Sequence, residues 1–356
     1  MSAFFAVIMA GGSGERFWPA SRSHKPKQLL SLFDKKTLIE HTVERQLPLC
    51  PAEQIIVITS RQLVKSLQNL LPIPAENIIG EPCRRDTAPA VGLAAAIVRK
   101  RGGDDAIMAM LPADQIIHDV DKYADTMKTL IKVAQKEKQL ITLGITPTYP
   151  ATGFGYIHRG SNFKNYNNVY DCLGFQEKPQ LELAEKLLRS QQYFWNAGIF
   201  VWSVKTIFDA LNQSAPQIAE IATGLSESSN FSADLEKQFP DMPKISVDYA
   251  IMEKARNIIV IPANFDWDDA GSWPALQNHL NADQDGNIAQ NAEIVTVDSN
   301  NNIIYSEVNN HTIAMVGIKD MIAVHTADAT LICPIHRAQE IKTIVQKLNE
   351  RGSKKL

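Results

Sequence analysis

Residues 4–18 read FFAVIMAGGSGERFW, an apolar run that leads directly into a glycine-rich turn. The run Phe4 to Met9 predicts a buried strand, because it is short and apolar and turn residues follow it. Gly11, Gly12 and Gly14 carry no side chain, so backbone N–H groups at this turn can approach anionic oxygens closely. The stretch therefore predicts a strand of an α/β sheet that ends in a loop able to hold a triphosphate.

Basic residues follow the glycines and narrow the kind of phosphate loop. Arg16, Lys25 and Lys27 can supply positive charge that the backbone cannot. A dinucleotide-binding fingerprint has a third glycine, a helix that starts there, and an acidic residue about 20 residues later. Here the third glycine is missing, and Pro19 and Pro26 lie where that helix would run, so this class of site is disfavoured. A Walker A loop is disfavoured, since no Gly-Lys-Ser/Thr follows at the required spacing. A plain tight turn remains the alternative for the glycines taken alone.

Length and composition are those of an ordinary globular protein. The 356 residues exceed one usual core, so we expect a catalytic domain over 1–280 and a small β-rich domain over 281–356. The net charge of −3 and the dispersed basic residues argue against a nucleic-acid partner.

The cysteines and the N-terminus suggest a cellular compartment. Cys50, Cys83, Cys172 and Cys333 lie far apart without a CxxC or Cys/His pattern, which argues against a zinc cluster and a disulfide framework. The first apolar run lacks a preceding basic segment and enters a glycine turn, so it is interpreted as a core strand and not a signal peptide. No apolar stretch is long enough to span a bilayer. We therefore expect a cytoplasmic protein with no membrane partner.

Up to residue 145, short β-branched runs alternate with amphipathic stretches, which predicts a Rossmann-like α/β fold with a mixed, mainly parallel sheet flanked by helices. The expected strands are Phe4 to Met9, Ile55 to Thr59, Ile78-Ile79, Ala106 to Leu111 and Leu140 to Gly144. The expected helices are Thr37 to Leu47, Gln62 to Leu70, Ala88 to Arg101 and Lys122 to Lys136. Thr37 and Glu40 have the spacing of a capping box, and Gly102-Gly103 predicts a helix end.

Beyond residue 145 the pattern is looser. Expected strands are Thr152 to His158, Tyr170 to Gln176 and Phe194 to Trp202, and expected helices are Leu181 to Ser190, Lys205 to Asn212, Gln217 to Gly224 and Tyr249 to Ala255. Leu225 to Lys244, rich in Ser, Asn and Pro, is interpreted as a surface excursion. A small β appendage is expected from Ile294 to His325, in partial β-helix-like form, and a final helix from Ala338 to Leu348. No full repeat is visible.

Acidic residues in two distant segments are candidates for a metal site. Asp114 follows a predicted parallel strand, at the edge of the sheet where ligands bind in open α/β folds. Asp266, Asp268 and Asp269 form a second cluster, whose like charges repel unless they are solvated or neutralised by a cation. Carboxylate oxygens are the ligands that Mg²⁺ prefers. Taken alone, Asp114 is more often a helix cap or turn residue, and the second cluster can equally be a solvated turn.

Three further segments are candidates for binding. Phe175 to Pro179 ends a strand and presents Glu177 and Lys178, which could contact sugar hydroxyls and phosphate or form an ordinary surface ion pair. In the segment Phe194 to Phe200, Asn196 lies between aromatic residues. This segment could bind a sugar ring, or its aromatic residues could belong to the core. Thr152 to Tyr156 contains Gly155, where backbone could meet a ligand or simply bend a hairpin.

The segment Glu81 to Pro89 precedes a predicted helix and contains the pair Arg84-Arg85. Asp86 or Thr87 is expected as the N-cap, with Pro89 in the first turn. Capping explains these residues but not the two arginines beside them.

Taken in order, these motifs resemble the sugar nucleotidyltransferases, and most closely the mannose-1-phosphate guanylyltransferases, over essentially the whole chain. The resemblance implies that the nucleotide is held by Gly11, Gly12, Gly14, Arg16, Lys27, Arg85, Asp86, Thr87, Pro89 and Asp114. It implies that mannose 1-phosphate is bound by Gly155, Glu177, Lys178, Asn196 and Asp248. It implies catalytic roles for Arg16, Lys27, Lys178, Asp114 and Asp269, the last two as ligands of Mg²⁺.

The implied reaction transfers GMP from GTP to mannose 1-phosphate and releases pyrophosphate, and a homodimer is expected. The pattern departs from the family at Asp86, where asparagine is more usual, and at Gln115, where histidine is frequent, so contacts to the base are the least secure part. Longer relatives add an isomerase domain, and no isomerase activity is expected here. The alternatives are a glucose 1-phosphate enzyme that uses UTP or TTP, and a non-catalytic sensor of nucleotide sugars.

Overall fold

The structure is a computed structural model, and it describes residues 2–353 and 355. The chain divides into two compact units. The first unit comprises the described residues of Met1–Gly11, Val43–Pro112 and Ile117–Trp267, and the second comprises those of Gly12–Thr42, Ala113–Ile116 and Asp268–Leu356. Gly11, the first glycine of the turn, is the last residue of one segment of the first unit. Gly12 and Gly14 belong to the second unit.

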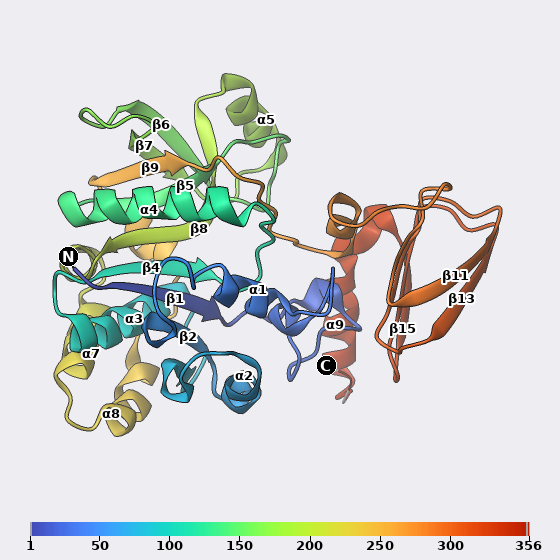
Figure 1. The fold of residues 1–356 in the computed structure, drawn as a ribbon, viewed down its shortest axis with the longest axis horizontal. Coiled ribbons are helices and arrows are strands. Elements are labelled where there is room, and N and C mark those ends of the chain that lie inside the picture. The colour runs from blue at the N-terminus through green and yellow to red at the C-terminus, as the bar shows by residue number, and fades with distance from the viewer. Residues whose placement is uncertain (1, 354, 356) are drawn as a thin grey trace. The chain divides into compact units, whose positions relative to one another are not determined.

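The first unit is built on a nine-stranded sheet with the order β3-β2-β1-β4-β8-β5-β9-β7-β6 (Figure 1). Its strands are β1 (Phe4–Ala10), β2 (Ile55–Ser60), β3 (Ile78–Glu81), β4 (Ile107–Pro112), β5 (Leu140–Ile145), β6 (Tyr156–Asn162), β7 (Tyr170–Gln176), β8 (Tyr193–Ser203) and β9 (Ile258–Pro262). Strands β3, β2, β1 and β4 pair in parallel, and β8 pairs antiparallel with β4, β5 and β6. The predicted mixed α/β sheet is confirmed.

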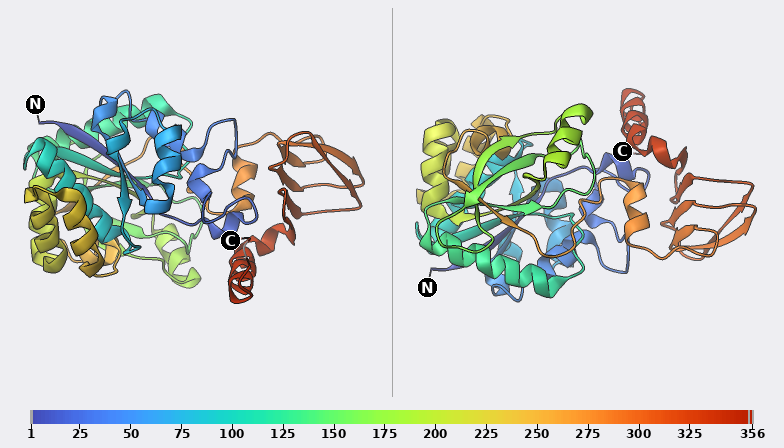
Figure 2. Two further views of the ribbon diagram at one scale, coloured as in Figure 1. Left: turned by 90° about the horizontal axis from the view of Figure 1, so that it is seen from below. Right: turned by 90° about the horizontal axis from the view of Figure 1, so that it is seen from above.

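Helices cover both faces of this sheet. They are α2 (Val64–Leu70), α3 (Thr87–Gly102), α4 (Val120–Lys136), α5 (Leu181–Ser190), α6 (Val204–Ser214), α7 (Pro216–Glu227) and α8 (Phe231–Gln238). Alternate residues of a strand point to opposite faces. Phe5 and Val7 of β1 accordingly share a buried cluster with α3, α6, α7 and α8, while α4 lies on the other side of the sheet (Figure 2).

Local signals in the sequence set several helix ends as expected. Before α1 (Leu38–Glu44), the backbone N–H of Thr37 donates to the carboxylate of Glu40 over 2.7 Å, and the Glu40 N–H donates to the Thr37 hydroxyl over 3.4 Å. Helix α3 ends at Gly102 and is followed by Gly103, whose φ is 77°. The predicted capping box and the glycine stop are both confirmed.

The interpretation of Leu225 to Lys244 as a surface excursion is wrong. Helix α7 extends to Glu227, α8 follows, and Phe239–Asp241 form a 3-10 turn. Leu235, Phe239 and Met242 are buried in the cluster beneath the sheet. The Ser, Asn and Pro residues lie at the helix ends, so composition hid a short apolar pattern that the core uses.

Other boundaries differ in smaller ways. The segment expected as a helix from Tyr249 to Ala255 is a π-helical turn over Asp248–Met252, and the strand expected from Thr152 begins only at Tyr156. Strands β9, β10 and β15 had no separate prediction.

The second unit contains parallel strands wound as a short β-helix. They are β10 (Ile288–Gln290), β11 (Ala292–Val297), β12 (Ile303–Ser306), β13 (His311–Val316) and β14 (Met321–His325). Strand β15 (Thr330–Pro334) pairs antiparallel with β14, and α9 (Ile341–Glu350) follows it. Ile288, Ile303 and Ile322 stack in register, and Asn302 donates from its side-chain amide to Asn287 over 2.9 Å. The stacked positions are unequally spaced in the sequence, which explains why no repeat is visible there.

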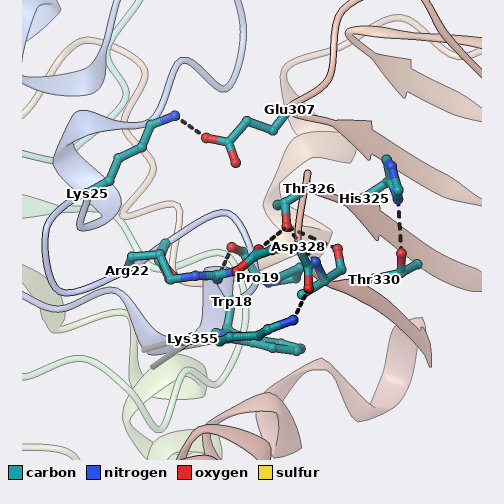
Figure 3. Close-up of polar contacts among 12 residues, drawn as sticks. Trp18, Pro19, Arg22, Lys25, Glu307, His325, Thr326, Asp328, Thr330 and Lys355 are labelled. Atoms are coloured by element: carbon teal, nitrogen blue, oxygen red, sulfur yellow. Dashed lines mark hydrogen bonds and ion pairs between the residues drawn. The ribbon is translucent and has the colours of Figure 1, made fainter. Parts of the chain in front are cut away.

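Within the second unit, residues 18–25 contact the loops that follow β12 and β14, and the end of the chain (Figure 3). Arg22 forms an ion pair with Asp328 at 2.9 Å, and Lys25 forms one with Glu307. The indole N–H of Trp18 donates to the carbonyl of Lys355 over 3.0 Å. These contacts join the segment after the glycine turn to the C-terminal part of the chain.

The described part of the chain contains no helix that is both long and apolar enough to cross a membrane. All four cysteines are unpaired. The domain boundary between residues 280 and 281 stays a prediction.

Candidate functional site

An antiparallel bridge in the second unit brings Asp114 and Asp269 to one place. The backbone N–H of Ile116 donates to the carbonyl of Asp268 over 2.9 Å, and the N–H of Asp268 donates to that of Ile116 over 3.1 Å. Asp114 lies two residues before one end of this bridge, and Asp269 lies directly after the other. Backbone pairing therefore joins two acidic segments that are far apart in the sequence.

Lys27 lies between these two acidic segments and is buried. Its ammonium group donates to the carboxylate of Asp114 over 2.8 Å and to the backbone carbonyl of Asp269 over 2.5 Å. Gly14 allows this arrangement: its φ is 65°, and a Cβ there would lie 2.3 Å from the Cβ of Lys27. The glycine turn thus makes room for the lysine as well as for a ligand.

A cavity of about 270 Å³ opens beside this lysine, and we call it the Lys27 cavity. Its lining consists of Ser13, Gly14, Glu15, Arg16, Lys27, Asp114, Asp269, Gly271 and Lys342. Three cations and three carboxylates therefore surround one hollow. Ser13, Glu15 and Gly271 lie in segments that the sequence identified, although they were not named as site residues. Lys342 was not predicted, because no motif connects its helix with the glycine turn.

The three aspartates of the second acidic segment have different surroundings. Asp266 accepts hydrogen bonds from the backbone N–H groups of His118 and Asp119, over 2.8 and 2.7 Å. Asp268 accepts from the N–H of Ala270 over 2.7 Å and lies 3.0 Å from the Nε2 atom of His279. Asp269 alone of the three lines the Lys27 cavity.

Burial is the main influence on the charge of Asp269. Burial raises the pKa of Asp269 to about 6, and the carboxylates of Asp114 and Asp268 act in the same direction. Lys27 and Arg16 lower this pKa but do not offset the other effects. A cation near Asp269 would relieve the repulsion.

The donor set fits a magnesium ion that is shared with substrate. Mg²⁺ in nucleotide enzymes is usually held by one or two carboxylates, with phosphate oxygens and waters completing the octahedron. Asp114 and Asp269 can supply such carboxylates beside an open cavity. Among the described residues there is no group of three or more His, Cys, Asp or Glu side chains that could hold a metal ion.

In the first unit, the residues expected on the sugar side form one connected group, which we call the Asn196 cluster: Gly155, Glu177, Lys178, Asn196 and Asp248. The Asn196 N–H donates to the carbonyl of Gly155 over 2.8 Å, and its side-chain amide donates to Asp248 over 2.9 Å. Lys178 donates to Glu177 over 2.6 Å. A Cβ on Gly155 would lie 2.5 Å from a carboxylate oxygen of Glu177, so the backbone passes directly beside that side chain.

Charge is unevenly balanced in the Asn196 cluster. Burial raises the pKa of Asp248 to about 6, and the negative charge of Glu177 adds to the rise, while Lys178 and the amide of Asn196 lower it. The side chain of Lys178 is 62% exposed, whereas that of Glu177, its ion-pair partner, is only 8% exposed. An exposed cation beside buried polar groups suits an anionic sugar.

Replacing Asp248 by Asn should stabilise the fold at neutral pH. The pKa of Asp248 is raised in the folded state, so its favourable contribution is present below about pH 4 and is lost as the pH rises through about 6. Asp248→Asn removes the buried charge, and we expect the free energy of unfolding at pH 8 to rise by about 1–3 kcal/mol, with little change at pH 4. Urea denaturation at both pH values measures this. A variant that is less stable at pH 8 would contradict the assigned surroundings of Asp248.

The Arg84 to Pro89 segment performs structural tasks in the first unit. Asp86 caps α3 by accepting from the N–H of Thr87 over 2.8 Å, as expected, and it does so with a φ of 70°. Arg85 donates to the carbonyl of Pro240, and the Thr87 hydroxyl accepts from the N–H of Val247 over 2.8 Å. Thr87 therefore supports the residue before Asp248, while the nucleotide contacts predicted for this segment stay predictions.

The sequence left Arg84 without an assigned role and did not single out Glu81. Arg84 donates to the carbonyl of Gly11 over 3.1 Å. Burial raises the pKa of Glu81, at the end of β3, to about 7, although Arg84 opposes the rise. A strongly perturbed carboxyl beside a predicted binding motif is a further candidate for the site.

The aromatic residue beside Asn196 belongs to the core. Trp195 is buried and meets Tyr149 and Phe154 edge to face, with ring centroids 4.8 and 5.2 Å apart. Its packing fixes the strand that carries Asn196, and it offers no open face to a sugar.

The family model described as nucleotidyl transferase matches residues 5–286, and the model described as a MannoseP isomerase/GMP-like beta-helix domain matches residues 292–348.

Individual relatives match nearly the whole chain. A Vibrio cholerae protein provisionally named as a mannose-1-phosphate guanylyltransferase is 38% identical, over 97% of this chain and 74% of its own length. An Escherichia coli mannose-1-phosphate guanylyltransferase is 32% identical, over 99% of this chain and 77% of its own length. A solved Thermus thermophilus structure, described as a mannose-1-phosphate geranyltransferase, is 32% identical with a TM-score of 0.87, covering 97% of this chain and 99% of that one.

Proposed function

The chain belongs to the nucleotidyl transferase family, and from this premise we propose that it transfers GMP from GTP to mannose 1-phosphate, producing GDP-mannose and pyrophosphate. The observation that carries the proposal is the Lys27 cavity, where a glycine turn, a buried lysine and two carboxylates meet. These are the groups that a triphosphate and its counter-ion require. The names of the relatives supply the choice of mannose 1-phosphate and of a guanine nucleotide.

In the proposed reaction, an oxygen of the sugar phosphate attacks the α-phosphorus of GTP in line. A new P–O bond forms, and the bond from the α-phosphorus to the oxygen bridging the β-phosphorus breaks. That oxygen leaves with the electron pair as part of pyrophosphate. The attacking phosphate is already ionised, so no general base is needed. Because both reactants are anions, catalysis consists mainly of charge neutralisation and alignment.

Each proposed role uses a group of suitable chemistry. Arg16 and Lys27 neutralise the triphosphate, and Lys178 neutralises the sugar phosphate. Asn196 and Glu177 offer an amide and a carboxylate to sugar hydroxyls. Asp114 and Asp269 would hold Mg²⁺, which when bound withdraws negative charge from phosphate oxygens.

Pyrophosphate release tests the proposal directly. The protein is incubated with Mg²⁺, each common nucleoside triphosphate in turn, and a panel of sugar 1-phosphates. We expect release only with both substrates present, fastest with GTP and mannose 1-phosphate. Faster release with UTP or TTP and glucose 1-phosphate would instead identify the alternative enzyme. Nucleotide-sugar binding without any release would identify a sensor.

A methyl group at Gly155 should weaken sugar-phosphate binding selectively. In Gly155→Ala the new Cβ forces Glu177 to move, because the two would otherwise lie 2.5 Å apart. We expect KM for mannose 1-phosphate to rise about tenfold, the size of one lost charge-assisted hydrogen bond, with KM for GTP unchanged.

Gly153→Ala is the matched control. A Cβ at Gly153 has no atom within 4 Å, so this variant should behave as the wild type. Equal kinetic effects of the two substitutions would show that the Gly155 contact has no part in sugar binding.

A further inference from the structure

We propose that Lys342, in the first turn of α9, binds the terminal phosphates of the nucleotide and the pyrophosphate that leaves. The inference rests on the proposed function and adds a residue that neither the motifs nor the matches to relatives assign. Lys342 lines the Lys27 cavity together with Ser13, Gly14 and Arg16 of the glycine turn.

Packing within the second unit holds α9 beside the glycine turn. Ile341, the residue before Lys342, is 2% exposed and shares a buried cluster with Phe17 and Trp18, which directly follow the turn. Gln339 donates from its side-chain amide to the hydroxyl of Ser272 over 3.3 Å, next to Gly271 of the cavity lining. The packing of Ile341 and the hydrogen bond of Gln339 therefore fix the part of α9 that places Lys342 at the cavity.

A further cation is needed to neutralise the negative charge in the Lys27 cavity when a triphosphate is bound. The ammonium group of Lys27 is already engaged by Asp114 and by the carbonyl of Asp269. Among the residues that the structure describes, Lys342 has no hydrogen-bond or ion-pair partner, and it is exposed to solvent. A triphosphate brings about four negative charges, and Glu15, Asp114 and Asp269 add three carboxylates to the same cavity. Together these charges exceed what Arg16, Lys27 and one magnesium ion neutralise.

Exposure also indicates which phosphates Lys342 meets. Lys27 is buried, whereas Lys342 lies on the solvent side of the same cavity. Pyrophosphate must depart to solvent after the reaction, so the terminal phosphates belong toward the exposed cation. The α-phosphate stays in the product and requires no such contact.

Kinetics in both directions test the assignment, with Lys342→Ala as the variant. We expect KM for GTP in the forward direction and KM for pyrophosphate in the reverse direction to rise roughly tenfold, as for one lost charge-assisted contact. KM for GDP-mannose should not change, because this compound lacks the terminal phosphates. Lys342→Arg should restore most of the loss. Lys347→Ala removes another exposed lysine of α9 that lies outside the cavity, and it should behave as the wild type.

Calorimetric titration with magnesium pyrophosphate separates this inference from the proposed function. Weaker binding to Lys342→Ala than to wild type and to Lys347→Ala supports the role of Lys342 even if the favoured nucleotide is not GTP. Equal pyrophosphate binding by Lys342→Ala and wild type, no binding by either, or an equal rise in KM for GDP-mannose would overturn it.

Discussion

Asp269→Asn is expected to lower kcat by about 10²-fold or more, by analogy with the removal of other groups that stabilise charge in a transition state. The substitution preserves shape but removes the carboxylate proposed to hold magnesium. The loss should be largest when Mg²⁺ is limiting, and the Mg²⁺ concentration that gives half-maximal rate should rise. Initial rates of pyrophosphate release across a magnesium titration measure both effects.

The same substitution should stabilise the free protein above pH 6. Because the pKa of Asp269 is raised to about 6 in the folded state, its contribution to stability is lost as the pH rises through that value. We expect Asp269→Asn to gain about 1–2 kcal/mol of unfolding free energy at pH 8, and little at pH 4. A gain in stability with a loss of rate identifies a functional charge and excludes simple misfolding.

Asp266→Asn is the matched control for Asp269→Asn. Asp266 accepts two backbone hydrogen bonds and does not line the cavity. We expect this control to lose stability but retain its magnesium dependence. Near-normal turnover of Asp269→Asn at limiting magnesium would refute the proposed role of Asp269.

Lys27→Met is expected to reduce kcat by about 10²-fold or more, as the buried cation of the triphosphate site is lost. Methionine has a similar length and no charge, so the change tests the ammonium group itself. The variant should also lose about 1–3 kcal/mol of unfolding free energy, since Asp114 and the carbonyl of Asp269 each lose a hydrogen-bond donor. Single-turnover rates and thermal unfolding report the two effects separately.

Lys35→Met serves as the control for this variant, because Lys35 is exposed in the same segment and outside the cavity. It should match the wild type in rate and stability. If Lys27→Met retained the rate while losing stability, Lys27 would be structural only.

Local chemistry made part of this protein predictable. The run into Gly11 predicted β1 correctly, and the Thr37 and Glu40 spacing predicted a cap, because these signals act over a few residues. The sequence identified Gly14 as a position where another group approaches the backbone closely. It did not show that this group is Lys27. The role of a glycine is local, whereas the identity of its neighbour depends on tertiary contacts.

Long-range pairing set the limit of prediction. No local sequence pattern predicts the antiparallel bridge between Ile116 and Asp268. This bridge nevertheless brings the two acidic segments together. Resemblance to a family supplied that association in advance. Lys342 had no motif at all, and its place at the cavity follows from the burial of Ile341. Helix α8, which follows Glu227 and buries Leu235, was missed because polar residues dominate the composition there.

A crystal structure of the protein with GDP-mannose and Mn²⁺ in place of Mg²⁺ tests the central claim most directly. Anomalous scattering locates the manganese ion without ambiguity. The account predicts one ion in the Lys27 cavity, bound by a carboxylate oxygen of Asp114, a carboxylate oxygen of Asp269 and an oxygen of the diphosphate. An ion bound elsewhere, or a diphosphate held away from Arg16 and Lys27, would contradict it.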